Sequence, residues 1–282
     1  MYCVDDLTLI LFSRDHLPFV DQCLESIYQE FGSSLKVLNV DVGSIDGTEK
    51  RIVQRAKELG ISLSQELRPR DTKTLTVLKS LEDSINSQFV VLLSSDDLFT
   101  SGYGRALLLA LDDLEGDAVL NFSLIETNSL LEPVRLHAPR WTNSVEKNKR
   151  MLSIMNPGTA AGSVIPFKKL KTLEVWKSVP PILIEDYWLW WTLIEYVPFI
   201  NVLNASAIYR KHGNNISGAK RNREYAYSLG FAAGLPRSMN NSGFNRRLSL
   251  FLLPRWGRHL ATSTWKDFLR GFLDSSKKKG TK

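Results

Sequence analysis

The sequence predicts an α/β protein whose mostly parallel, doubly wound sheet occupies roughly the first 125 residues. Apolar runs of strand length alternate with segments of helical periodicity, at the spacing of βαβ units. These runs are apolar without interruption, as expected for strands that helices cover on both faces. In such sheets ligands bind beyond the carboxyl ends of the strands. The residues that follow each apolar run are therefore the first candidates for a functional site.

The predicted strands and helices follow one another in a regular order. Strands are expected at Leu7 to Phe12, Leu35 to Val40, Phe89 to Leu93 and Ala118 to Phe122. The intervening helices are predicted from apolar residues three and four positions apart, and Gly60 ends the second of them. The apolar positions of the helices are Val20, Leu24, Ile27 and Phe31; Ile52, Ala56 and Leu59; Leu75, Leu78 and Ile85; and Leu107, Leu108 and Leu111.

The rest of the chain is less regular. Five prolines interrupt residues 126–180, and Pro181 follows directly. The stretch IEDYWLWWTLIEYV then predicts a helix, and INVLNASAIYR predicts a strand. From about residue 219 the chain is typical of basic helices. We therefore divide the chain into residues 1–125, 126–217 and 218–282, of which the last is a helical C-terminal extension.

Charge is distributed unevenly along the chain. Residues 211–282 contain 15 Lys and Arg against 3 Asp and Glu, whereas residues 1–210 contain 21 against 27. A basic tail suits an anionic surface, such as membrane lipid, nucleic acid or an acidic partner, and a solvated basic face is the alternative. Because no motif that reads RNA or DNA is present, we expect no nucleic-acid partner.

The tail also contains an amphipathic helical pattern. Its apolar positions are Trp265, Phe268, Leu269, Phe272 and Leu273, with Lys266 and Arg270 between them. Such a helix either lies on an anionic membrane or packs against protein. No segment approaches the ~20 apolar residues that cross a bilayer, and two acids precede the first apolar run where a secretory signal needs positive charge. We expect a cytoplasmic protein, peripheral on the inner face of the membrane if these basic C-terminal helices bind lipid.

Three predicted strands end in polar residues. These ends are FSRDH at residues 12–16, DVGSIDGT at 41–48 and SSDD at 94–97. Two adjacent carboxylates after a buried strand require a cation or hydrogen-bond donors to compensate them. Mg²⁺ or Mn²⁺ would supply that charge, and capping of the next helix by Asp96 or Asp97 is the alternative. In the second stretch, Asp46 or Ser44 is expected to cap a helix that starts near Thr48.

Together these segments resemble the family 2 glycosyltransferases, nucleotide-sugar-binding enzymes with the GT-A fold. The resemblance covers residues 7 to about 217, with its motifs in the family's order, and leaves out the tail. The matching motifs are Ser13-Arg14-Asp15; CLESIYQ; NVDVGSIDGT, against VVDDGSTDGT in the family; Asp96-Asp97; Glu185-Asp186 before an aromatic helix; and YRKHGNNIS.

The resemblance implies inverting, metal-dependent transfer of a sugar from a nucleoside diphosphate to an acceptor hydroxyl, in the synthesis of surface polysaccharide or glycolipid. It implies that Asp97, with Asp96 beside it, binds Mn²⁺ or Mg²⁺, and that Asp186, next to Glu185, is the general base. A UDP-sugar is the expected donor, and a glycan or lipid-linked molecule the acceptor. The implied nucleotide-sugar-binding residues are Ser13, Asp41, Arg70, Asp96, Arg210 and His212.

The same resemblance gives the first two parts of the chain their roles. Residues 1–125 would form the nucleotide-sugar-binding half of one domain, and residues 126–217 its acceptor-binding half. Simpler alternatives exist for some residues: Arg70 in a solvated basic loop, His212 hydrogen-bonded to backbone, and Glu185 with Asp186 favoured by a helix dipole.

The chain departs from the family pattern at two positions. Val42 replaces an Asp that commonly contacts the nucleobase, and Ser94 replaces a further Asp before the acidic pair. Valine cannot accept a hydrogen bond. Either base recognition has moved to Asp41 or to backbone groups, or the chain is a catalytically degenerate nucleotide-sugar- or glycan-binding relative. Because the acidic pair and Asp186 are retained, we favour an active enzyme.

Overall fold

The computed structural model of the protein describes residues 2–70, 72–152, 156–173, 185–213, 215 and 265–274. The chain forms two compact units. The first comprises Met1–Asn143, Gly158–Trp176 and Val197–Lys211, and contains the whole sheet. The second comprises Ser144–Pro157, Lys177–Tyr196 and His212–Lys282. The predicted division at residues 125 and 217 stays a prediction.

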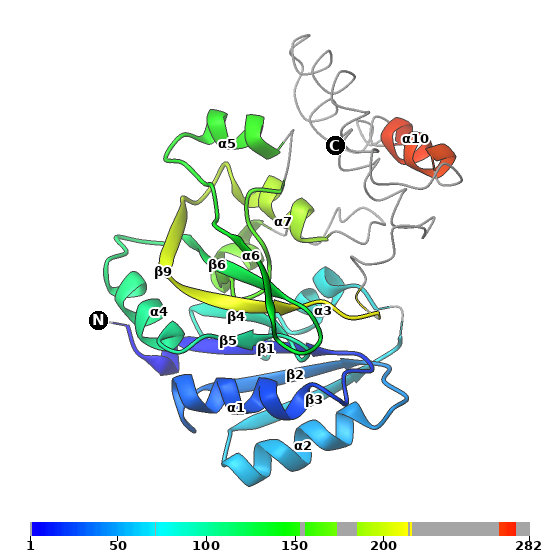
Figure 1. The fold of residues 1–282 in the computed structure, drawn as a ribbon. Coiled ribbons are helices and arrows are strands. Elements are labelled where there is room, and N and C mark those ends of the chain that lie inside the picture. The colour runs from blue at the N-terminus through cyan, green and yellow to red at the C-terminus, as the bar shows by residue number, and fades with distance from the viewer. Residues whose placement is uncertain are drawn as a thin grey trace. The chain divides into compact units, whose positions relative to one another are not determined.

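The first unit begins with a βαβ arrangement that confirms the predicted class. Strands β1, β2 and β4 correspond to the first three apolar runs. Strand β3 was not predicted, because its sequence LSQELR is mostly polar. The elements are β1 (Leu7–Ser13), α1 (Val20–Phe31), β2 (Lys36–Val42), α2 (Thr48–Leu59), β3 (Leu63–Arg68), α3 (Thr74–Ser80) and β4 (Phe89–Ser94). Figure 1 shows these strands in one sheet, with α1 and α2 side by side along it.

Strands β3, β2, β1 and β4 are neighbours in this order and all run parallel. Their register places Ser13 opposite Asp41, and Phe12 opposite Ser94. The carboxyl ends of the strands therefore meet at one edge of the sheet. The loops that follow β1, β2, β3 and β4 all begin at this edge, which is where the fold class places a ligand.

The remaining strands make the sheet mixed. The later elements of this unit are β5 (Leu98–Phe99), α4 (Tyr103–Asp112), β6 (Val119–Thr127), β7 (Pro133–His137), β8 (Val164–Pro166), α6 (Phe167–Leu173) and β9 (Phe199–Arg210). Strand β8 joins β4 to β6 in antiparallel pairs, whereas β9 runs parallel to β6 and antiparallel to β5. The long β9, predicted from INVLNASAIYR, brings Arg210 back to the carboxyl edge.

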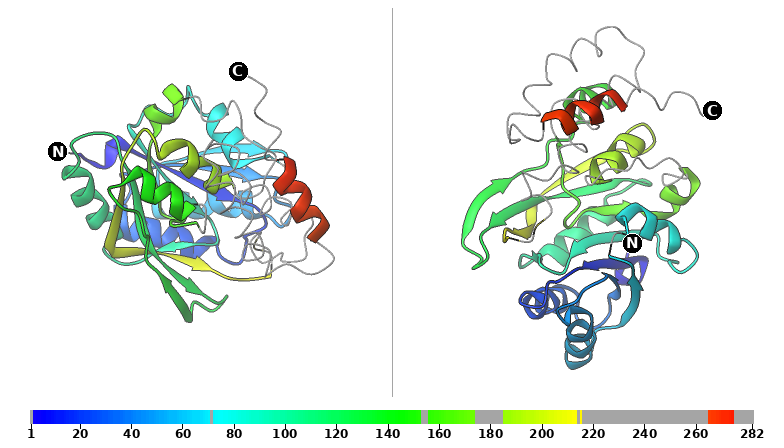
Figure 2. Two further views of the ribbon diagram at one scale, coloured as in Figure 1. Left: turned by 90° about the horizontal axis from the view of Figure 1, so that it is seen from above. Right: turned by 90° about the vertical axis from the view of Figure 1, so that its right-hand side faces the viewer.

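The main core of this unit lies between the sheet and three helices. Leu7, Leu9 and Leu11 alternate along β1 and pack in one cluster with residues of α1, α2 and α4. Figure 2 shows these helices from two further directions. The predicted helix over residues 75–85 is shorter than expected: α3 ends at Ser80 and turns follow, although Leu81 and Ile85 are buried. Asp83, Ser84 and Asn86 in this stretch have low helix propensity, which explains the early end.

The second unit contains three described helices, α5 (Val145–Leu152), α7 (Glu185–Leu193) and α10 (Trp265–Asp274). Helix α7 confirms the helix predicted from the aromatic stretch, and α10 confirms the amphipathic pattern, with Phe268 and Phe272 buried and Leu269 and Leu273 exposed. The other segments predicted as basic helices lie outside the described residues. None of the helices described is long and apolar enough to cross a membrane.

One close contact between α1 and α4 sets where α4 begins, shortly after β5. The backbone N–H of Gly104 donates to Glu30 Oε2 at 2.9 Å, and that of Gly102 donates to Glu30 Oε1 at 3.1 Å. The carboxylate thereby binds the positive end of α4. A Cβ at Gly104 would lie 2.6 Å from the backbone oxygen of Glu30, so only glycine allows this approach.

We predict that Gly104→Ala lowers the free energy of unfolding by about 1–3 kcal/mol, because overpacking forces α1 and α4 apart. Gly116→Ala is the matched control, since a Cβ there meets no atom within 4 Å; its effect should stay within about 0.5 kcal/mol. Urea titration followed by circular dichroism measures both. Equal stability of the two variants would contradict this account of the contact.

Candidate functional site

The turn after β2 is built around Asp41, whose side chain is only 2% exposed. Asp41 Oδ2 accepts hydrogen bonds from Ser13 Oγ at 2.8 Å and Ser44 Oγ at 2.5 Å, and Oδ1 accepts the Ser44 N–H at 2.8 Å. These three bonds compensate the buried carboxylate. Val42 takes part in none of them. The DVGS turn therefore keeps its shape without an acid at residue 42.

Asp46 ties the same turn to the start of α2 and to the loop after β1. Its Oδ1 accepts the N–H of Thr48 at 3.0 Å, and its Oδ2 accepts the N–H of Leu17 at 3.1 Å. Helix α2 starts at Thr48 as predicted, but its N-cap is Gly47 without a side-chain cap bond, so the prediction that Asp46 or Ser44 caps the helix is wrong. Asp46 binds the first helical N–H from the position before the cap. The Thr48 hydroxyl in turn accepts the N–H of His16 at 2.8 Å. Asp46 is thus used to fix two loops.

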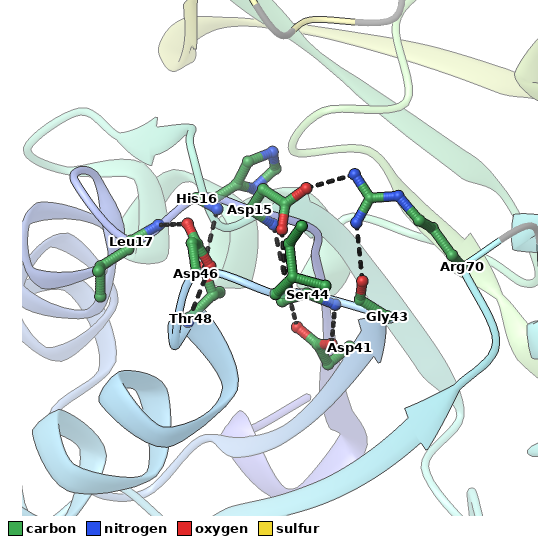
Figure 3. Close-up of polar contacts among 10 residues, drawn as sticks. Asp15, His16, Leu17, Asp41, Gly43, Ser44, Asp46, Thr48 and Arg70 are labelled. Carbon is green, nitrogen blue, oxygen red and sulfur yellow. Dashed lines mark hydrogen bonds and ion pairs between the residues drawn. The ribbon is translucent and has the colours of Figure 1, made fainter.

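Arg70, from the loop after β3, extends over both of these loops (Figure 3). Its Nη2 donates to Asp15 Oδ2 at 2.5 Å and its Nη1 donates to the carbonyl of Gly43 at 2.8 Å. Gly43 has φ +69°, and a Cβ there would lie 2.9 Å from the Arg70 backbone, so the approach requires glycine. The hydrogen bond from Arg70 lowers the pKa of Asp15, and the N–H of Ile45 adds to this effect.

The acidic pair lies directly after β4, with Asp96 4% and Asp97 2% exposed. Asp97 Oδ1 accepts the backbone N–H of Arg210 at 3.0 Å. Burial raises the pKa of Asp97 well above its ordinary value, and the neighbouring charge of Asp96 raises it further. The pair therefore has the electrostatic character of a cation-binding position, and Asp96 is not the cap of a following helix, since β5 comes next.

Two basic groups lie beside the acidic pair. The buried Arg210 guanidinium donates to Gln22 Oε1 at 2.7 Å and stacks 4.6 Å from the ring centre of Phe19. Burial lowers the pKa of Arg210, whereas the charges of Asp96 and Asp97 oppose this. His16 Nε2 lies 3.5 Å from Asp96 Oδ2, and its Nδ1 lies 2.9 Å from Ser95 Oγ.

The donor set at this position fits a divalent cation. It consists of a carboxylate oxygen of Asp96 and one imidazole nitrogen of His16, with the carboxylate of Asp97 next in the sequence. Carboxylates suit Mg²⁺ and Mn²⁺, and an imidazole nitrogen suits transition metals rather than Mg²⁺. Of the two acids, Asp96 faces His16, while Asp97 is engaged by the backbone of Arg210.

The structure brings several predicted site residues together in the first unit. Ser13, Asp41, Asp96, Asp97 and Arg210 surround the carboxyl edge of β1, β2 and β4, and Arg70 closes over it with a half-exposed side chain. Sequence reasoning assigned no role to Asp15 or His16, although the strand end FSRDH had been recognised as polar. Their partners come from residues 30 to 80 positions later, which local sequence does not reveal.

The other predicted residues belong to the second unit, which is described by itself. Asp186 is the second residue of α7, and its half-buried carboxylate accepts Asn156 Nδ2 at 2.8 Å. Burial raises the pKa of Asp186, whereas the N–H of Tyr187 and the Asn156 amide partly oppose the rise. Glu185 begins the same helix. The N–H of His212 donates to Asn215 Oδ1.

Comparison with known proteins shows which fold this is. No family model matches the sequence, and no curated protein matches it either. Solved structures do match. A mannosyltransferase from Pyrobaculum calidifontis, in complex with GDP-Man and Mn²⁺, superposes with a TM-score of 0.60 at 12% identity, over 98% of this chain and 76% of the other.

The S. aureus TarS fragment 1-349 is similar as well. Its complex with UDP superposes with a TM-score of 0.63 at 14% identity, over 95% of this chain and 80% of the other. Its complex with UDP-GlcNAc gives 0.60 at 12% identity, over 96% and 89%. The chain therefore has the fold of these glycosyltransferases, and the predicted fold class is confirmed.

We predict that Arg70→Gln raises the pKa of Asp15 toward its ordinary value, because the hydrogen bond that favours the carboxylate is lost. Arg51→Gln is the matched control, since Arg51 lowers the pKa of Asp21 in the same way. Carboxyl NMR titration reads each group separately. A change at both groups in either variant would contradict the assignment of these pairs.

The lowered pKa of Asp15 also makes the free energy of unfolding depend on pH. A pKa lowered by folding stabilises the folded state above the unfolded pKa, and this contribution disappears as pH falls through the folded pKa. Arg70→Gln should therefore lose less stability than the wild type between neutral pH and pH ~3.

Proposed function

We propose that this protein is an inverting, metal-dependent glycosyltransferase of the family 2 type, which moves a sugar from a nucleoside diphosphate to an acceptor hydroxyl. The observation that carries the proposal is the buried Asp96–Asp97 pair at the carboxyl edge of the parallel strands, beside the Asp41 turn and Arg210. The shared fold supports it, because the similar proteins were solved with GDP-Man and Mn²⁺, with UDP and with UDP-GlcNAc.

The donor nucleotide is proposed to bind over the loops after β1, β2 and β3. Asp41 and Ser13 fix the turn that lies under it, and Arg70 provides positive charge at its rim. We propose a UDP-sugar as the donor. With Val42 in place of an acid, base recognition falls to backbone groups of this turn or to Asp41, whose oxygens already hold Ser13 and Ser44.

Asp96 and Asp97 would hold Mn²⁺ or Mg²⁺, which when bound offsets the negative charge that develops on the departing diphosphate. Asp97 also fixes the end of β9 through the Arg210 N–H. Arg210 keeps its guanidinium next to the two acids and adds positive charge there. We place His212, two residues further along, near the same diphosphate.

The proposed general base is Asp186, with Glu185 beside it. An acceptor hydroxyl becomes an effective nucleophile when its proton passes to a carboxylate as the new bond forms. Asn156 Nδ2 donates to Oδ2 of Asp186 and so fixes the orientation of the carboxylate. The raised pKa of Asp186 makes it a stronger base than an ordinary aspartate. One base suffices for direct displacement with inversion at the sugar carbon.

The acceptor is proposed to be a glycan or lipid-linked molecule, in surface polysaccharide or glycolipid synthesis. Helix α10 exposes Lys266 and Arg270 together with Leu269 and Leu273, a combination that suits the headgroup region of an anionic membrane. We therefore propose a cytoplasmic protein that binds peripherally to the inner face of the membrane. The second candidate function, favoured by Val42 and Ser94, is a non-catalytic nucleotide-sugar- or glycan-binding relative.

We predict that, in the presence of Mn²⁺, one nucleotide sugar from a panel of UDP- and GDP-sugars raises the melting temperature of the protein. The rise should be about 5 °C when the sugar nucleotide is present at about 100 times its Kd. EDTA or Asp96→Asn should remove most of this shift, because the diphosphate loses its counter-charge. Asp117→Asn, an exposed acid of the same unit, is the control and should leave the shift unchanged. If no nucleotide sugar raised the melting temperature, the proposed function would be wrong.

We predict that Asp186→Asn lowers kcat by about 10²–10⁴-fold while donor binding stays unchanged. Glu195→Gln, an exposed acid of the second unit paired with Lys149, should keep wild-type activity. Activity should rise with pH as Asp186 loses its proton, at a higher pH than for an ordinary aspartate. Asn156→Ala should move this rise to still higher pH, because the bond that favours the carboxylate is removed.

The two measurements together separate the candidate functions. Donor binding without turnover in the wild type would favour the non-catalytic relative. Full turnover in Asp186→Asn would show that another group removes the proton.

A further inference from the structure

Two histidines of the first unit face carboxylates, but the two pairs have different geometry. His137 Nε2 lies 3.0 Å from Glu126 Oε2, a hydrogen-bond distance, and Lys211 Nζ contacts the other oxygen of Glu126 at 2.6 Å. His16 Nε2 lies 3.5 Å from Asp96 Oδ2, beyond the ~2.7–2.9 Å of a charge-assisted hydrogen bond. The two pairs therefore differ in geometry, and the second is the one that lies at the acidic pair after β4.

His16 is held in place by one contact of its backbone and one of its ring. Its backbone N–H donates to Thr48 Oγ1 at 2.8 Å, and its Nδ1 is 2.9 Å from Ser95 Oγ. With Nδ1–H donating to that hydroxyl, the lone pair of Nε2 faces Asp96 Oδ2. Metal-binding histidines are oriented in this way, by a hydrogen bond at the nitrogen that does not bind the metal. Both side chains are largely buried.

The 3.5 Å separation is within about 0.5 Å of that expected for two ligands on one ion. Two donors each ~2.1 Å from a metal lie about 3.0 Å apart at a right angle and about 3.4 Å apart at a tetrahedral angle. A proton shared between the two atoms would draw them closer than this. A cation between them satisfies the lone pair of Nε2 and the charge of Asp96 together.

We propose that His16 Nε2 and Asp96 Oδ2 bind the same divalent cation, and that His16 makes this site prefer Mn²⁺ over Mg²⁺. The inference rests on the proposed function, whose cation site it completes. Mg²⁺ favours oxygen ligands and near-ideal octahedral geometry, whereas first-row transition metals, of which Mn²⁺ is the weakest binder, accept mixed nitrogen and oxygen sites. His16 is thus a metal ligand that determines cation selectivity, in addition to the two acids.

The test is calorimetric titration of the full chain, without nucleotide, with MnCl₂ and separately with MgCl₂. The wild type should bind Mn²⁺ at least tenfold more tightly than Mg²⁺. His16→Gln should weaken Mn²⁺ binding about 10–100-fold, the range seen when a metal site loses a supporting group. Since the glutamine amide offers an oxygen instead, Mg²⁺ binding should change much less. His137→Gln is the matched control and should bind both ions as the wild type does.

Several results would overturn the proposal. One is equal affinity of the wild type for the two ions, which needs no variant and so remains decisive if His16→Gln fails to fold. Another is unchanged Mn²⁺ binding by a folded His16→Gln, which would show that His16 is only an ion-pair partner of Asp96.

Failure of this inference is distinguishable from failure of the proposed function. His16-dependent Mn²⁺ binding without any nucleotide-sugar binding would leave the cation site in place and remove the transferase. Sugar transfer by His16→Gln with wild-type Mn²⁺ affinity would support the transferase and show that His16 is not a ligand of the cation.

Discussion

Two adjacent carboxylates buried at the end of β4 are the constraint around which the described site is organised. A buried charge is costly unless opposite charge or hydrogen-bond donors compensate it. The chain meets this requirement through Arg210 at the end of β9, with its backbone N–H and its guanidinium, while His16 from the loop after β1 faces Asp96. Strands β1, β4 and β9 are therefore linked electrostatically as well as by packing.

The loops around this pair use their polar residues to hold one another. Asp41 is bound to Ser13 and Ser44, and Arg70 joins Asp15 to Gly43. A site whose loops are already fixed loses little conformational freedom when a ligand binds, so more of the contact energy remains as affinity. The same arrangement explains how Val42 is tolerated, because the residues that shape the turn are its neighbours.

Much of the fold and part of the site could be predicted from the sequence. Uninterrupted apolar runs such as FVVLL identified β4 as a buried parallel strand, and Asp46 before Thr48 identified the start of α2. The prediction was less successful where local signals are weak. Strand β3 is mostly polar, β5 and β8 have only two and three residues, and α3 ends before Ile85. Pairing with neighbouring strands decides β3, β5 and β8, whereas low helix propensity after Ser80 ends α3.

The sequence by itself determined the α/β class, the order of its main elements and the polar ends of its strands, because hydrophobic periodicity and turn chemistry act over a few residues. Only the tertiary structure decided which polar groups meet. Asp15 with Arg70, His16 with Asp96 and Asp97 with Arg210 are separated by 55, 80 and 113 residues. Strand order and register place them side by side, and both depend on long-range pairing that local sequence does not encode.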